Sequence, residues 1–226
     1  MVFLIIILLI IGAVVYFKMS GDSKEVKKLY KDRTTEQKDV IRYFCSDGCF
    51  SKTISDAQYD ELVRKKVDSL KLREKAINKI GLDESEIREI APVNLEGYRF
   101  EKAYSKYGKD KLWRTSKYEV TWIFASGKQL YVYSYQFNMD EDGKRERTEE
   151  YFWKDITNFS TITETREVGI DWDSKKGEYK SRKNVDEQDF AIVVPGDKYI
   201  CAAEVSENVE RAIQGMKAKL REKKNG

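Results

Sequence analysis

Residues 118–137 read YEVTWIFASGKQLYVYSYQF, and this stretch decides the fold class. Large apolar side chains occupy the even positions from Tyr118 to Phe124, and they return at the odd positions from Tyr131 to Phe137. An apolar period of two is typical of β-strands, because successive side chains of a strand point to opposite faces. Ser126-Gly127 between the two runs marks a turn, so the stretch predicts two neighbouring antiparallel strands.

Alternating patterns continue on the C-terminal side of this pair. Asp142-Gly143 predicts a hairpin turn, since this dipeptide tolerates the positive φ angles that such turns require. The further predicted strands are residues 149–156, 159–167, 169–172, 178–183, 190–194 and 199–205. About seven short antiparallel strands with turns between them indicate a β-sandwich or a partly open barrel.

Helical periodicity dominates on both sides of the strands. Residues 23–44 have helix-compatible spacing, and residues 56–80 form a stronger helix that Ser55 and Gln58 begin as a capping box and Gly81 ends. Ser206 begins a closing helix with one apolar face. We therefore predict an α+β chain with a transmembrane anchor (1–18), a helical stalk (19–94) and a β domain closed by a C-terminal helix (95–226).

The N-terminal segment Val2–Phe17 carries no charged side chain and is rich in Ile and Leu. As a helix it would be about 25 Å long, close to the thickness of the hydrocarbon core of a bilayer, and Lys18 would extend to the interface. A cleaved signal peptide is the alternative, but the segment lacks a basic start and a small-residue cleavage site. Basic residues follow the segment and none precedes it, which predicts a single-pass cell-membrane protein with a cytoplasmic domain.

Composition excludes several classes of function. Lys and Arg (42) nearly balance Asp and Glu (39), which argues against a nucleic-acid binder. The sequence contains no histidine, so it lacks the usual general base and the commonest metal ligand. No phosphate-binding or nucleophile motif occurs either. We therefore predict a non-enzymatic protein without cofactor or metal.

The strand order with a last amphipathic helix is that of pleckstrin-homology-like (PH-like) domains. The segment Glu149–Ser160 (EEYFWKDITNFS) resembles the middle strand of bacterial PH-like proteins, and Val194–Asp197 followed by a helix also fits. More broadly, residues 70–224 resemble a family of uncharacterised bacterial membrane-anchored proteins. The segments Arg114–Thr121 and Ala212–Lys217 are the ones most typical of that family. The resemblance implies the fold and a bacterial source, and it brings no binding residues.

The best candidate contact surface is a basic stretch that falls between the first two predicted strands. In lipid-binding PH domains this region holds anionic headgroups, and each charge near an anionic leaflet contributes about 1 kcal/mol. Solvated lysine is the alternative interpretation. The stretch comprises Lys102, Lys106, Lys109, Lys111, Arg114 and Lys117.

Two further features have open interpretations. Cys45 and Cys49 are a possible redox pair, which would form a disulfide in an oxidising compartment and stay reduced in the cytoplasm. Tyr131, Tyr133 and Tyr135 are either core residues or an exposed aromatic patch, and burial of three rings favours the core. The acids around Asp142 lack the remaining ligands of a calcium loop, so a hairpin turn is favoured there.

These observations support three hypotheses about function. The first is a membrane-tethered, non-catalytic PH-like module that binds a protein partner or the lipid headgroups of the inner leaflet. The second is a cell-envelope protein with an outward-facing domain and a Cys45–Cys49 disulfide. The third and least favoured is an enzyme that uses carboxylates alone, which would require convergent acids in a closed cleft.

Overall fold

The structure is a computed structural model, and it describes residues 22–46, 53–83, 91–204 and 206–225. The predicted membrane anchor Val2–Phe17 lies outside these residues. None of the helices in the described ranges is both long and apolar enough to cross a bilayer.

Within residues 22–83 the structure describes four helices, where the sequence predicts two. They are α2 (Lys24–Leu29), α3 (Thr35–Cys45), α4 (Asp56–Leu70) and α5 (Leu72–Ile80). A new capping box, Thr34 with Gln37, begins α3 and separates it from α2. Lys71 adopts a left-handed conformation (φ 46°) that ends α4, so the predicted single helix over 56–80 is wrong in this detail. The predicted capping box at Ser55 and the stop at Gly81 are confirmed.

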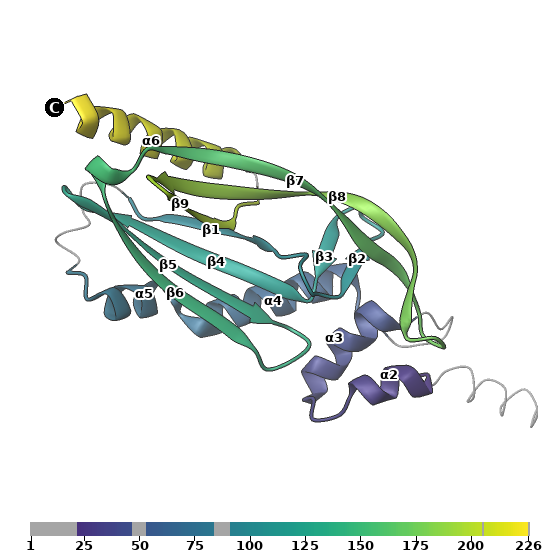
Figure 1. The fold of residues 1–226 in the computed structure, drawn as a ribbon. Coiled ribbons are helices and arrows are strands. Elements are labelled where there is room, and N and C mark those ends of the chain that lie inside the picture. The colour runs from purple at the N-terminus through teal and green to yellow at the C-terminus, as the bar shows by residue number, and fades with distance from the viewer. Residues whose placement is uncertain (1–21, 47–52, 84–90, 205, 226) are drawn as a thin grey trace, which may run out of the picture.

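An antiparallel sheet of four strands forms the middle layer of the molecule (Figure 1). Its spatial order is β1 (Val93–Tyr98), β4 (Lys117–Ala125), β5 (Gln129–Asn138) and β6 (Lys144–Phe152). The pair predicted from the opening stretch is confirmed, with Trp122 opposite Tyr133. The predicted turn at Asp142-Gly143 joins β5 to β6, and the Asn138 amide donates to the Gly143 carbonyl over 3.2 Å.

Both faces of this sheet are buried, each in its own core. Tyr131, Tyr133 and Tyr135 are all at least nine-tenths buried against the helices, which confirms them as core residues. Leu130 and Val132 point to the opposite face and pack in a second core with the remaining strands. The helices from the predicted stalk region therefore lie against the sheet and share its core.

A second antiparallel sheet covers that opposite face. It consists of β7 (Asn158–Asp173), β8 (Glu178–Val194) and β9 (Asp197–Ala202). Four short strands were expected over residues 159–194, and this prediction is wrong: β7 and β8 are continuous and pair over almost their whole length. Gly169 lies inside β7, and the Tyr179 ring of β8 occupies the space that a Cβ at this position would fill.

Two smaller elements complete the fold. The hairpin of β2 (Ser105–Tyr107) and β3 (Trp113–Thr115) is inserted between β1 and β4, and a short 3-10 turn, η1 (Trp153–Asp155), follows β6. The last helix, α6 (Glu207–Asn225), buries Ile213, Met216 and Leu220 in the second core, as its apolar face predicts. The fold class is thus α+β with antiparallel sheets and a C-terminal helix, and the described strands form no closed barrel.

Candidate interaction surfaces

The structure divides the six basic residues of the predicted contact stretch into two groups. Lys102, Lys109 and Lys111 are exposed. The other three are bound to the protein itself, so the stretch does not present one continuous basic surface.

Arg114 is the most buried of the six, with only 2% of its side chain exposed. Its Nε and one terminal nitrogen donate to the two Asp60 oxygens of α4, each over 2.7 Å. Its terminal nitrogens also donate to the Asp110 carboxylate over 2.9 and 2.6 Å. These hydrogen bonds lower the pKa of Asp110 to about 2 and raise the pKa of Arg114. Arg114 therefore fastens the β2–β3 hairpin to α4 and is unavailable to a ligand.

Lys106 and Lys117 are half-buried and donate to backbone carbonyls. The Lys106 ammonium lies 3.8 Å from the centre of the Tyr43 ring and donates to the Tyr43 carbonyl over 3.1 Å. Lys117 donates to the Glu101 carbonyl over 2.7 Å. Burial lowers the pKa of Lys106, which is consistent with an inward-facing role.

The tip of the β2–β3 hairpin is apolar as well as basic. Leu112 is 60% exposed and Tyr107 is 38% exposed, and they are two of the three most exposed large hydrophobic residues in the described chain. Lys183 reaches over from β8, with its ammonium 3.9 Å from the Tyr107 ring. The sequence gives no sign of this neighbour, since it is remote along the chain.

A second basic surface lies where the described chain begins, and it combines two segments that are remote in sequence. The turn between β7 and β8 packs against α2: the Ser23 hydroxyl donates to the Ser174 carbonyl, and Gly177 faces the Glu25 side chain. Figure 1 shows the β7–β8 turn and α2 at the same end of the molecule. We call the exposed lysines of these two segments that form no ion pair with another described residue the entry surface: Lys24, Lys27, Lys31, Lys175 and Lys176.

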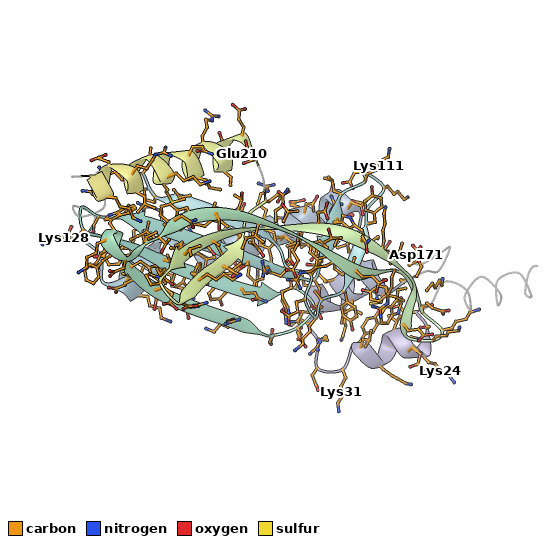
Figure 2. All side chains as sticks on the ribbon, turned by 45° about the horizontal axis from the view of Figure 1, so that its top comes forward. Lys24, Lys31, Lys111, Lys128, Asp171 and Glu210 are labelled. Atoms are coloured by element: carbon orange, nitrogen blue, oxygen red, sulfur yellow. The ribbon has the colours of Figure 1, made fainter. Side chains whose placement is uncertain are left out.

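The charges of the entry surface are available to a ligand. None of its five lysines forms an ion pair with another described residue, whereas the neighbouring Lys28 is paired with Glu25 over 2.7 Å. The nearby Asp22 is already bound to Arg42 and to the Tyr30 hydroxyl. In Figure 2, Lys24 and Asp171 mark this end, and Lys128 lies at the opposite end.

Acidic residues do converge between the two sheets, around Arg99. Its guanidinium pairs with Asp189, with Glu187 over 3.5 Å and with Glu119 over 3.7 Å. Glu119 also accepts the Ala202 amide over 2.9 Å. Burial raises the pKa of Glu119 and of Asp189, and Arg99 counteracts the increase. The cluster ties the end of β1 to β8 and β9, and its carboxylates are bound to Arg99 or the backbone.

Cys45, half of the predicted redox pair, has a free and fully buried thiol. Burial raises its pKa well above the usual range for a thiol. Cys49 lies outside the described residues. Cys201 is likewise buried and free, as expected for a core thiol.

No cluster of three metal-ligating side chains occurs within the described ranges. The acids of the β5–β6 turn contact α3 and the residues before it instead: Gln37 of α3 donates to Asp142 over 2.8 Å, and Arg33 pairs with Glu141 over 2.8 Å. No protein-family model, curated protein or solved structure matches this chain. The resemblance to bacterial PH-like proteins therefore stays a prediction.

Proposed function

We propose that this chain is a membrane-tethered, non-catalytic interaction module whose entry surface rests on anionic lipid headgroups. The observation that carries the proposal is the contact of α2 with the β7–β8 turn, because these two segments carry five exposed lysines that form no ion pair with another described residue. The order of elements also supports a PH-like fold, because four strands of one sheet are followed by three of another and then by a helix.

Chain length sets the distance between the entry surface and the bilayer. With the anchor at Val2–Phe17, only residues 18–21 separate it from Asp22. Four residues span at most about 14 Å, which is comparable to the distance over which salt screens charges, about 8–10 Å. The lysines of α2 are therefore held within reach of the potential of the leaflet, whereas Lys109 and Lys111 have no such constraint.

The attraction is large enough to fix how the domain sits on the membrane. Each lysine near an anionic leaflet contributes about 1 kcal/mol, and the exposed acids Asp32, Asp171 and Glu178 of the same segments oppose it, so the net attraction is about 2 kcal/mol. Anionic lipids are enriched in the cytoplasmic leaflet, and the positive-inside rule orients the domain toward the same side.

Hydrogen exchange of the full chain in nanodiscs tests the proposal. We expect slower exchange of the amides of α2 and of residues 173–178 in phosphatidylserine nanodiscs than in phosphatidylcholine nanodiscs. The double variant Lys175→Glu/Lys176→Glu should lose this difference, because reversal of two charges removes about 4 kcal/mol of attraction.

The matched control reverses two exposed lysines elsewhere, Lys128→Glu/Lys154→Glu; Lys128 lies at the far end of the molecule (Figure 2). This control should keep the lipid-dependent protection of the wild type. Equal exchange in the two lipids for the wild type would refute headgroup contact by the entry surface.

A further inference from the structure

A groove runs along β1 on the side of the molecule that carries the β2–β3 hairpin. Its larger pocket, about 420 Å³, lies between α4 and the face of β1 and β4 that points to the helices. Its smaller pocket, about 190 Å³, lies between the end of β1 and strands β8 and β9. Four residues line both pockets, so the two lie side by side: Tyr98, Leu112, Trp113 and Glu204. We call this feature the β1 groove.

The walls of the groove are rich in apolar and aromatic side chains. Tyr118 and Trp122 line the larger pocket, and Phe100 and Val185 line the smaller one. Leu112 stands at the shared wall with 60% of its surface in solvent. An exposed leucine at the edge of apolar pockets is typical of a binding surface, because burial of its exposed area against a partner is favourable.

The charge of the groove is strongly negative. Of its carboxylates, Asp60 is neutralised by Arg114, and Glu187 is neutralised by Arg99 and Arg166. Among the described residues that line the two pockets, four other carboxylates remain against a single further cation, Arg64: Asp68, Glu96, Asp186 and Glu204. Burial raises the pKa of Glu96, and Glu204 and Asp68 raise it further. The groove therefore complements a positive ligand.

At the centre of the groove, the backbone of β1 already has a hydrogen-bond partner. The Glu204 amide donates to the Glu96 carbonyl over 2.9 Å, so the outer edge of β1 is closed at that point. A ligand would be recognised by side-chain contacts in the pockets rather than by addition of a strand.

From these observations we infer that the β1 groove binds a polypeptide segment of a partner protein that carries both basic and apolar residues. An Arg or Lys side chain enters the larger pocket, where the carboxylates and the Trp122 and Tyr98 rings surround it. A neighbouring apolar side chain enters the smaller pocket beside Leu112 and Phe100. The groove is independent of the entry surface, so this inference stands or falls separately from lipid contact.

Fluorescence anisotropy with the full chain in phosphatidylcholine nanodiscs tests the inference. The probe is a labelled hexapeptide amide of alternating Leu and Arg. A peptide with Glu for each Arg should not bind, and one with Gly for each Leu should bind at least tenfold more weakly. Free arginine amide should compete only at far higher concentration; competition equal to that of the peptide would show a site for small cations and overturn the inference.

Variants locate the binding on the chain. Asp68→Lys/Glu204→Lys changes two exposed residues, so the fold is retained, and we expect at least a tenfold rise in Kd. Leu112→Ser should weaken binding several-fold. The control Glu210→Lys, on the exposed face of α6 (Figure 2), should bind as the wild type does. Unchanged affinity in the double variant would refute the assignment to the β1 groove.

Discussion

Replacement of Arg114 by methionine probes the contact that positions the β2–β3 hairpin. Loss of one partner from a buried ion pair costs about 3–5 kcal/mol. The penalty is smaller here, because Asp60 and Asp110 remain 39% and 41% exposed and regain water once Arg114 is gone. We therefore expect Arg114→Met to lower the free energy of unfolding by about 2–3 kcal/mol, or the midpoint temperature by about 5–10 °C. Arg114→Lys should recover little of this, since an ammonium cannot replace the two-pronged guanidinium.

The assay is urea unfolding of the full chain in nanodiscs, followed by tryptophan emission. Arg145→Met serves as a matched control, because Arg145 is exposed on β6, and it should stay within about 0.5 kcal/mol of the wild type. The depressed pKa of Asp110 adds a pH signature: its stabilisation is present above about pH 4 and is lost as the pH falls through about 2. A loss below about 0.5 kcal/mol in Arg114→Met would refute the role assigned to this contact.

Three other predictions follow from local geometry. Gly169→Ala should destabilise the chain by about 1–3 kcal/mol in the same urea assay, because the new methyl group would overlap the Tyr179 ring; an unchanged midpoint would contradict that packing. Burial raises the pKa of Glu96, so the contribution of this side chain to stability is full below about pH 4 and is lost as the pH rises through the pKa that Glu96 has in the folded state. Glu96→Gln should therefore flatten the pH dependence of the unfolding free energy. An unaltered pH profile would count against the burial of Glu96. Cys45 and Cys201 should resist N-ethylmaleimide at pH 7 until the chain unfolds, as read by peptide mass spectrometry; rapid labelling of either in the native state would show that it is accessible.

Local patterns predicted much of the fold. The alternation around Tyr118–Phe137 predicted the β4–β5 pair, and the capping box at Ser55 predicted the start of α4. Both depend on residues adjacent in sequence, so they can be read without the tertiary structure. The periodicity of α6 predicted its buried face for the same reason.

Features that depend on remote partners were not predictable. The Tyr179 ring that packs over Gly169 comes from the next strand, so the sequence around Gly169 does not show it. The left-handed Lys71 that ends α4 carries no local signal either. Both faces of the central sheet are buried, so the alternation alone could not show which face meets the helices.

The candidate surfaces were predictable only in part, because they too depend on contacts between residues that are remote in sequence. The spacing of basic residues in 102–117 suggested one basic surface. However, Arg114 is hydrogen-bonded to Asp60 of α4, and Lys106 is hydrogen-bonded to the Tyr43 carbonyl. The entry surface combines segments about 150 residues apart, as the Ser23–Ser174 hydrogen bond shows. Their contact follows only from the length and curvature of the β7–β8 hairpin.

In the proposed arrangement the entry surface faces the bilayer. This orientation can be measured by NMR on the full chain in nanodiscs that contain phosphatidylserine, through the paramagnetic relaxation caused by lipids with a nitroxide on the headgroup. We expect strong broadening of the amides of α2 and of residues 173–178, and none around Lys128 at the opposite end. Broadening around Lys128 with sharp signals from Lys24 and Lys175 would contradict it.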